Sequence, residues 1–357
     1  MGSYPINRVS LSSLMPSNST KILLLITLVG GVLVSVSSNS WLGAWIGLEI
    51  NLISFIPLMS NIKNIYNTEA SLKYFIIQVL ASATLLFLVT IKTLTEDLFS
   101  FDRNLYTSII ICTPLLLKSG AAPLHWWFPG VIEGLRWENC ALLITVQKAA
   151  PLILISYLIE INAFTLRIIL LSTIVGSIGG LNQTSIRKIL TYSSINHTGW
   201  ILIALTTREN LWLVYFTIYS ILALTVVSAI RLSGVSFINQ TIMTNKEATL
   251  IKFIIFTSLL SLGGLPPFLG FLPKWIVIQA IITNNIAPLA TVVVVTSLIT
   301  LYYYLKISYS SFIILNTEPK WNLKFHKNKS TKNIRALALS TISLTGIAAC
   351  SIISNIN

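Results

Sequence analysis

The feature that most constrains the fold is a series of apolar stretches of about 20 residues, which recurs from residue 21 to residue 353. Each stretch can cross a hydrocarbon core as a helix. Of the 357 residues, 54% are hydrophobic and 10% are charged, and the mean hydropathy is +0.79, a composition that soluble domains do not have. Stretches such as 22–36 and 291–301 are apolar on every face, which excludes the strict alternation of a membrane β-barrel. The sequence therefore predicts an all-α polytopic membrane protein.

The apolar stretches predict about eleven transmembrane helices. Their expected ranges are 21–38, 41–60, 70–92, 105–126, 138–159, 164–182, 188–206, 210–231, 250–283, 287–314 and 334–354. The corresponding parts of the chain are an N-terminal segment (1–20), a first five-helix bundle (21–159), a second five-helix bundle (160–314), and a basic loop with a C-terminal helix (315–357).

The net charge of +13 is distributed over the membrane loops, which indicates membrane topology and not a nucleic-acid partner. Of the 24 Lys and Arg residues, 15 fall on the N-terminal side of the predicted helices and 4 fall in loops on the opposite side. Loops rich in Lys and Arg stay on the inner face of a membrane. We therefore expect the N-terminus on the inner side and the C-terminus on the opposite side.

Two predicted helices carry the same G-x-x-P interruption close to a lysine. The first interruption, 120–123, follows Lys118, and the second, 263–266, precedes Lys274. Proline removes a helical hydrogen bond, and the freed carbonyl is tolerated at membrane depth only where it faces protein or a wet cavity. Paired broken helices point to a transport site between repeated bundles, whereas two ordinary proline kinks are the alternative. We predict two inverted-repeat bundles with two Gly/Pro-broken helices.

Four charged residues lie in apolar helical surroundings: Glu49, Lys118, Lys148 and Lys274. A charge at the centre of a membrane helix costs roughly 2.5–3.5 kcal/mol on insertion scales, so its presence needs a reason. Desolvation lowers the pKa of a buried lysine and a nearby carboxylate raises it, so such a lysine can change its charge near neutral pH. A chain of these groups can pass protons. Glu49 beside Lys118 would form a pair whose making and breaking changes the proton affinity of both partners.

Each of these residues also has a purely structural interpretation. Glu49 and Lys118 could form a static buried ion pair, and Lys274 could extend its ammonium group to an interface. His125 and His197 can relay protons because imidazole titrates near neutral pH. They could equally be hydrogen-bonded interior histidines or, as a pair, haem ligands.

Two further lysines are expected to be anchors and not members of a proton path. Lys73 lies four residues after Glu69, which is the favourable order for a helical ion pair. Lys306 lies near the end of a predicted helix.

The sequence predicts no cofactor or metal site in this chain. It contains no GxGxxG motif, no phosphate-binding GxxxxGK[ST] loop and no large soluble segment. The three cysteines, Cys112, Cys140 and Cys350, lie far apart and have no iron–sulfur or zinc spacing. Whatever drives proton movement would therefore be supplied by other proteins.

Five long motifs resemble the NADH:ubiquinone oxidoreductase chain 2 family of mitochondria, from about residue 20 to about residue 315. The motifs are WIGLEIN at 45–51, SLKYF at 71–75, KSGAAPLHW at 118–126, GGLNQTSIRK at 179–188 and SLGGLPPFLGFLPKW at 261–275. The resemblance implies an antiporter-like subunit in the membrane arm of respiratory complex I, with one proton channel and no redox cofactor of its own. NADH, FMN, iron–sulfur clusters and ubiquinone would be bound by other subunits. The implied partners are the other membrane-arm subunits and the lipid bilayer, including cardiolipin, with no nucleic acid.

The resemblance also assigns roles to the matching positions. Glu49 and Lys118 would form the coupling ion pair, Lys148 would be the central channel lysine, and Lys274 would be the outlet lysine of the second broken helix. His125 and His197 would belong to the same hydrophilic axis. The implied location is the inner mitochondrial membrane, with the N-terminus on the matrix side and the C-terminus on the intermembrane side.

Two features depart from the family pattern, and two other functions compete with it. Val146 stands where the family often has Trp, and the chain has only four Met, whereas the family is often methionine-rich. The first alternative is a cation/proton antiporter subunit of the related Mrp type, which usually keeps additional N-terminal helices. The second is a passive scaffold that anchors neighbouring subunits. The Mrp type would use the same lysines without quinone chemistry, whereas replacement of Lys148 by alanine separates the scaffold from a proton channel.

Overall fold

A computed structural model describes residues 18–60, 64–98, 104–208, 210–243, 249–312 and 341. These residues form helices and contain no named β-strand, only one isolated antiparallel bridge between Ser185 and Phe237. The seven helices of 19 or more residues are α1 (Asn18–Ser37), α2 (Trp41–Met59), α3 (Ile65–Leu98), α8 (Ala163–Leu181), α9 (Ile186–Thr207), α10 (Leu211–Ser233) and α14 (Ala287–Phe312). The shorter helices are α4 (Asn104–Ser119), α5 (Trp127–Gly134), α6 (Trp137–Ile144), α7 (Val146–Ser156), α11 (Ile238–Met243), α12 (Thr249–Gly263) and α13 (Phe271–Thr283).

Within this described part, seven helical segments are long and apolar enough to cross a membrane. Six of them belong to α1, α2, α3, α8, α10 and α14, and the seventh is Trp137–Ser156, which joins α6 and α7. The finding confirms the predicted all-helical membrane protein. The expected C-terminal helix at 334–354 lies outside the described residues except for Thr341, and the division into two five-helix bundles stays a prediction.

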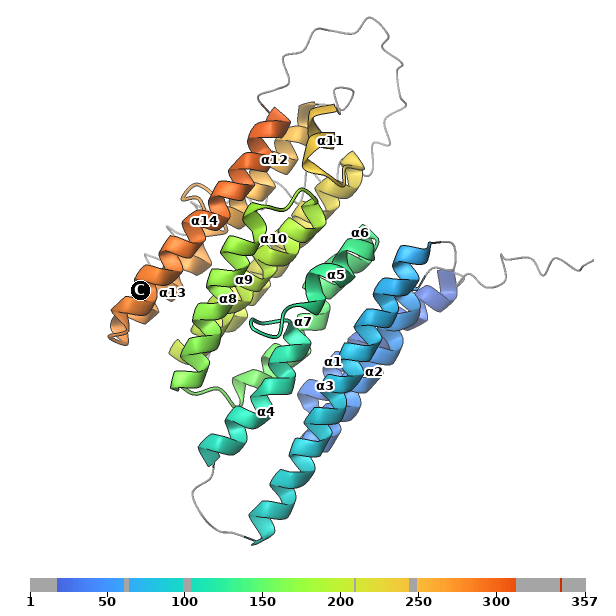
Figure 1. Cartoon of the computed structure of the whole chain (residues 1–357), viewed down its shortest axis with the longest axis vertical. Coiled ribbons are helices and arrows are strands. Elements are labelled where there is room, and N and C mark those ends of the chain that lie inside the picture. Colours follow the sequence, from blue (N-terminus) through green and yellow to red (C-terminus); the bar gives the residue numbers. More distant parts are fainter. Residues whose placement is uncertain are drawn as a thin grey trace, which may run out of the picture.

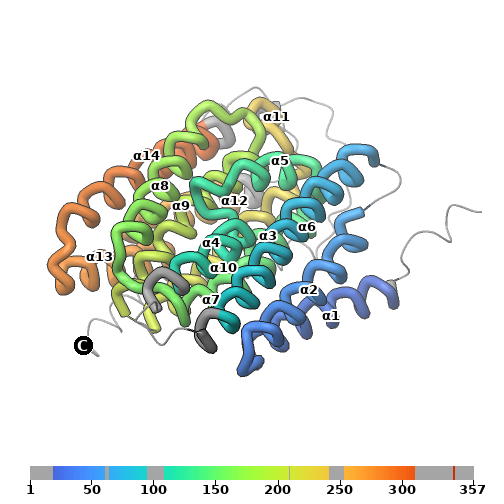
Figure 2. Tube along the Cα trace, turned by 60° about the horizontal axis from the view of Figure 1, so that its bottom comes forward, coloured from blue at the N-terminus to red at the C-terminus, as the bar shows by residue number. Residues whose placement is uncertain are grey.

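The helices run side by side in an order that follows the chain across the bundle. Figure 1 shows α1, α2 and α3 on one side, α4 to α7 next to them, and α8 to α10 with α12 to α14 on the far side. Figure 2 shows the same order from another direction, with α1 and α13 at opposite edges. A residue on α2 and a residue on α13 therefore lie at opposite ends of an axis that crosses the bundle through α4, α7 and α9.

Helix α9 lies in the interior, and its composition explains why it is not among the seven apolar segments. Seventeen of its 22 residues are buried. They include serine, threonine, asparagine and histidine side chains that lower its hydropathy but face other helices instead of lipid. Gly176 on α8 lets the two helices approach closely, because a methyl group there would be 2.8 Å from the Cα of Asn196. Small residues serve this purpose at helix contacts in membranes.

Two of the helix interruptions coincide with the G-x-x-P motifs. Helix α4 ends at Ser119, and Gly120 has φ +73°, a left-handed conformation that glycine adopts without strain. Helix α12 ends at Gly263, and Gly264 has φ +81°. The expected continuous helix at 105–126 was wrong, because α4 ends at Ser119 and the next helix, α5, begins only at Trp127.

A third interruption was not predicted. The expected helix at 138–159 is divided at Thr145, which has φ −108° and ψ −78° and separates α6 from α7. The Thr145 hydroxyl donates to the Ala141 carbonyl at 2.8 Å and thus competes with the helical pattern. Pro151 removes a further backbone donor in α7. The break lies directly before Lys148.

Contacts between loops hold one end of the bundle together. Ile186 donates its backbone N–H to the Ser236 carbonyl, and Ile238 donates to the Thr184 carbonyl, each at 3.0 Å. Lys188 pairs with Glu133 at 2.8 Å, so the start of α9 is also tied to the end of α5. These links join residues that are 50 or more positions apart in the sequence.

Adjacent glycines on α1 give a test of the close contact with α2. A methyl group at Gly31 would lie 2.8 Å from the Asn51 nitrogen, whereas a methyl group at Gly30 would have no atom within 4 Å. We expect Gly31→Val to push α1 away from α2 and to lower the free energy of unfolding by about 1–3 kcal/mol. Gly30→Val should change it by less than about 0.5 kcal/mol. Unfolding of the full chain in mixed detergent micelles, followed by circular dichroism, measures both; equal losses would contradict the packing.

Candidate functional site

The charged residues of the apolar helices form a row across the bundle. Glu49 lies on α2, Lys118 in the last turn of α4, Lys148 in the first turn of α7 and Lys274 in the first turn of α13. The exposed fractions of the three lysines are 7%, 1% and 6%, in that order. Lys274 therefore does not extend to an interface. The row follows the axis of helices seen in Figures 1 and 2.

Lys118 lies at the break between α4 and α5. The break exposes the final carbonyls of α4, and two side chains satisfy them: Trp127 Nε1 donates to the Leu117 carbonyl at 3.2 Å, and Gln78 Nε2 donates to the Lys118 carbonyl at 3.5 Å. The C-terminal end of a helix carries partial negative charge, so an ammonium group is stabilised there. The broken helix thus explains how a buried lysine is accommodated at this place.

Glu49 and Lys118 are electrostatic neighbours but do not touch. The charge of Glu49 acts on the Lys118 ammonium group, yet none of the ion pairs among the described residues joins them. One Glu49 carboxylate oxygen, Oε2, is buried without a hydrogen-bond partner in the described structure. The structure therefore holds the expected pair in an open arrangement, and a static ion pair does not describe it.

A small cavity of about 20 Å³ borders both Lys118 and Lys148. Asn51, Tyr74 and Gln78 contribute polar groups to its lining, and a polar space of this size can hold about one water molecule. The lining residues are Leu48, Asn51, Leu52, Tyr74, Gln78, Lys118, Ser119, Trp127, Phe128, Leu143, Gln147, Lys148 and Pro151. The two lysines thus border one space without an intervening helix.

Three side chains in the lining of this cavity are connected by hydrogen bonds. Gln147 Nε2 donates to Asn51 Oδ1 at 2.9 Å, and Tyr74 donates its hydroxyl proton to Gln147 Oε1 at 3.2 Å. These hydrogen bonds connect α2, α3 and α7, and they fix the side chain next to Lys148. Tyr74 is held in turn by edge-on contact with Phe55, with ring centroids 5.4 Å apart.

Lys148 is turned inward by the break at Thr145. Its Nζ donates to the Ser194 carbonyl on α9 at 3.2 Å and lies 4.7 Å from the ring centroid of Phe128. A cation over an aromatic face is attracted by the ring quadrupole. Lys148 therefore stands between the cavity on one side and α9 on the other.

His197 continues the row beyond Lys148. Its Nδ1 is 2.9 Å from the Tyr215 hydroxyl, and its ring lies 4.7 Å from that of Tyr219, centroid to centroid. Both Lys148 and Lys274 act on His197 electrostatically. On α9, His197 lies one turn after Ser194, which binds Lys148, and one turn before Trp200, which Lys274 contacts. An interior histidine with one hydrogen bond and two cationic neighbours is well placed to take part in proton transfer.

Lys274 lies at the break between α12 and α13. Its Nζ donates to the Gly263 carbonyl, the last of α12, at 2.8 Å, and lies 5.8 Å from the Trp200 ring centroid. Gly264 makes room for the lysine, because a methyl group there would lie 2.9 Å from Lys274 Cδ. Both broken helices thus bring a buried lysine to the break, but only Lys274 is seen to donate to the carbonyl end of the first half, whereas Trp127 and Gln78 satisfy the carbonyls at the end of α4.

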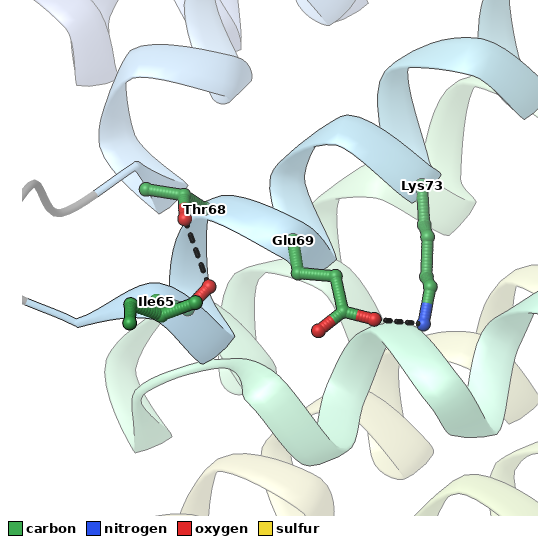
Figure 3. A network of polar contacts seen from close by, with 4 residues as sticks. All are labelled: Ile65, Thr68, Glu69 and Lys73. Atoms are coloured by element: carbon green, nitrogen blue, oxygen red, sulfur yellow. Dashed lines mark hydrogen bonds and ion pairs between the residues drawn. The ribbon is translucent and has the colours of Figure 1, made fainter.

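The other singled-out residues lie away from this row. His125 is in the turn between α4 and α5, where its Nδ1 is 3.2 Å from the Pro123 carbonyl, and it does not line the cavity. Lys73 pairs with Glu69 at 2.6 Å on the exposed side of α3, as Figure 3 shows. Lys306 is exposed on α14. Lys73 and Lys306 therefore fit the predicted role of anchors.

Several polar residues beside this row were not predicted from the sequence as site residues. Asn51, Gln147, Tyr215 and Tyr219 are buried or half-buried in helices that are otherwise apolar, and that contrast is the signal that could have found them. In the described part of the chain, no group of three or more His, Cys, Asp or Glu side chains comes together as a metal site would require.

Comparison with known proteins agrees with this architecture. Residues 38–300 match the family model for the transmembrane region of NADH:quinone oxidoreductase/Mrp antiporter subunits. The NADH-ubiquinone oxidoreductase chain 2 of Anopheles gambiae is 49% identical over 335 residues, which cover 92% of this chain and 96% of that protein. The corresponding chain of Locusta migratoria is 43% identical over 337 residues, or 94% and 98% of the two chains.

Two solved structures share the fold at low sequence identity. A chain of respiratory complex I from Thermus thermophilus with bound aureothin has a TM-score of 0.79 and 23% identity, with 94% of this chain and 80% of that chain covered. A chain of the Mrp complex from Dietzia has a TM-score of 0.75 and 17% identity, with 92% and 75% covered. The sequence relatives go further than the fold and confirm the resemblance drawn from the motifs. The chain therefore belongs to the NADH-ubiquinone oxidoreductase chain 2 family.

Proposed function

We propose that the chain is the proton-translocating, antiporter-like subunit of respiratory NADH:ubiquinone oxidoreductase, and that protons pass along Glu49, Lys118, Lys148, His197 and Lys274. The observation that carries the proposal is the continuous buried row. One cavity borders the first two lysines, and His197 is an electrostatic neighbour of the last two. Each group can gain or lose a proton, and bound water can connect such groups.

The open arrangement of Glu49 and Lys118 suggests how the row could be switched. When the carboxylate approaches the ammonium group, it favours the protonated lysine; when it withdraws, the proton is released more easily. Released protons could enter the cavity that Lys148 also borders. A change of the α2 position relative to α4 would therefore alter the proton affinity of Lys118 first and that of Lys148 second.

The finer architecture follows from the same proposal. The two breaks, α4/α5 and α12/α13, each bring a lysine to the carbonyl end of a half-helix, which supports two inverted-repeat bundles with eleven helices in all. His125 lies in the first break and stays a predicted accessory relay. The chain itself would hold no redox centre, since NADH, FMN, iron–sulfur clusters and ubiquinone would bind to other subunits.

The family also suggests the setting of the chain. As a chain 2 subunit it would lie in the inner mitochondrial membrane, in contact with the other membrane-arm subunits and with lipid, cardiolipin included. Its apolar surface fits that setting: helix α1 exposes Ile22, Leu23, Ile26 and Leu33 by more than half of their surface. The Mrp-type alternative shares the fold, but the chain 2 relatives at 43–49% identity favour the respiratory complex.

Replacement of Lys148 separates proton transfer from scaffolding. Lys148→Met keeps the length of the side chain and removes the proton-carrying amine, so we expect transfer through this chain to slow by roughly two orders of magnitude. The number of protons pumped per NADH should then fall by the share that this chain carries. The measurement is NADH-driven proton uptake in vesicles that contain the intact complex, after a native gel shows this chain in the NADH-oxidising band.

The matched control for that experiment is Lys306→Met, which removes the same charge at an exposed position on α14. It should pump as the unaltered complex does. Unchanged pumping by fully assembled Lys148→Met would leave only the scaffold function. Migration of the chain apart from the NADH-oxidising band would instead favour the Mrp-type alternative.

Replacement of Glu49 tests the switch. Glu49→Gln preserves the shape of the side chain but removes the charge that acts on Lys118, and we expect pumping to slow by about tenfold. Glu69→Gln is the control, because Glu69 is an exposed carboxylate whose helical ion pair stabilises little. A pumping rate that is the same in both variants would show that Glu49 does not control the row.

The proposed orientation places the N-terminus in the matrix and the C-terminus on the intermembrane side, because 15 of the 24 basic residues fall on the N-terminal side. A protease that is added outside mitoplasts should therefore remove a tag from the C-terminus and leave a tag at the N-terminus intact. The opposite pattern, or protection of both tags, would overturn this orientation.

A further inference from the structure

Three polar groups in the second half of the described bundle are buried without a hydrogen-bond partner. They are the Trp200 indole Nε1–H and the hydroxyls of Tyr303 and Tyr304. Burial of a donor without a partner costs free energy comparable with that of a lost hydrogen bond, so native structures normally supply one. At sites inside a protein that lack a side-chain or backbone partner, the usual partner is bound water.

Tyr304 lies beside the outlet lysine. The edge of its ring packs against Gly263, where a methyl group would lie 3.6 Å from Tyr304 Cδ2, and the carbonyl of Gly263 accepts the Lys274 ammonium hydrogen bond. Its hydroxyl faces Ser193 and Tyr303, but it makes no hydrogen bond of normal geometry with either. The edge of the Tyr304 ring therefore lies beside the turn that binds Lys274, whereas its hydroxyl faces α9 in the interior of the bundle.

Tyr219 lies on the other side of the same region, close to Lys148. It faces Ser194, whose carbonyl accepts the hydrogen bond of the Lys148 ammonium group. Its ring packs against His197, and it is also an electrostatic neighbour of Tyr304. Tyr219 on α10 therefore lies near the residue that binds Lys148, and Tyr304 on α14 packs beside the residue that binds Lys274.

We propose that Tyr219 and Tyr304, with water bound at their hydroxyls, form a relay that connects Lys148 to Lys274. The inference rests on the proposed proton path and adds two residues to it. A proton that leaves Lys148 enters the bound water; each tyrosine hydroxyl accepts a proton on its oxygen and gives its own proton to the next water. The last transfer goes to neutral Lys274, so each tyrosine ends in the state in which it began.

The competing interpretation is that the two tyrosines only fill space between α9, α10 and α14. Substitution by phenylalanine separates the two roles, because it removes the hydroxyl and keeps the ring. If the Tyr304 hydroxyl had only a packing role, its loss would leave pumping unchanged. In the relay, its loss interrupts proton transfer although the packing remains.

Helix α14 offers a matched control two positions before Tyr304. Tyr302 is 61% exposed, so Tyr302→Phe makes the same chemical change on the same helix but faces outward. The experiment compares Tyr304→Phe, Tyr219→Phe, Tyr302→Phe and Lys148→Met in the intact complex. It measures protons pumped per NADH, the solvent deuterium isotope effect on pumping, and the melting temperature.

We expect Tyr304→Phe and Tyr219→Phe to slow proton transfer through this chain roughly tenfold or more. Protons pumped per NADH should then fall by nearly the same fraction as in Lys148→Met. The melting temperature of Tyr304→Phe should stay the same or rise, because the lost hydroxyl had no partner. Tyr302→Phe should match the unaltered complex in all three measurements.

Two results would overturn the relay. One is that Tyr304→Phe and Tyr219→Phe both pump as Tyr302→Phe does, while Lys148→Met is impaired; the proton path would then stand without the tyrosines. The other is a lower melting temperature that accounts for the loss of pumping in both variants, which would show that the tyrosines act through packing. If Lys148→Met itself pumps normally, the proposed function fails independently of the relay.

Discussion

The rest of the structure depends on one constraint, the cost of leaving a peptide N–H or C=O without a partner inside a membrane. Continuous helices meet this constraint within themselves, and most of the described chain takes that solution. The exceptions are the interruptions after Ser119, at Thr145 and after Gly263. The first two interruptions lie within three residues of a buried lysine, Lys118 or Lys148. The third is contacted by a buried lysine, because Lys274 donates to the Gly263 carbonyl. The free carbonyls and the lysines therefore have to be understood together.

A buried ammonium group and an exposed helix end are each unfavourable alone, and each reduces the cost of the other. Lys274 donates to the last carbonyl of α12, and Lys118 ends α4 beside carbonyls that Trp127 and Gln78 satisfy. A permanent ion pair would hold a lysine in one charge state, whereas a neutral carbonyl binds the ammonium group more weakly. The broken helices thus keep lysines inside the membrane without fixing their charge.

The sequence predicted the features that depend on composition and local chemistry. The apolar stretches gave the helices, and the G-x-x-P motifs marked two of the breaks, because proline and glycine act on their own neighbours in the chain. The break at Thr145 has no such marker. It arises from a threonine that bonds back to Ala141, which many threonines in helices do without interruption of the helix.

The geometry of the candidate site was less accessible from the sequence. Glu49 and Lys118 could be chosen as charges in apolar helices, but their separation depends on the relative position of α2 and α4. The contact of Gln147 with Asn51 joins residues 96 positions apart, so no local pattern could indicate it. Residues 302–304 are three consecutive tyrosines, so the sequence does not show which of them are buried. The orientation of α14 decides this: Tyr303 and Tyr304 are buried and Tyr302 is exposed.

The polar, buried character of α9 has a consequence for how the protein is made. A segment that begins with Arg187 and Lys188 and contains Asn196 and His197 partitions into a bilayer poorly by itself. Its neighbour α8 is apolar, and glycines bring the two helices into close contact. During synthesis, α9 therefore has to enter the membrane as the second arm of a hairpin with α8, with its polar groups covered before lipid reaches them. The helix that carries His197 and binds Lys148 is thus also the one whose membrane insertion depends most on its partners.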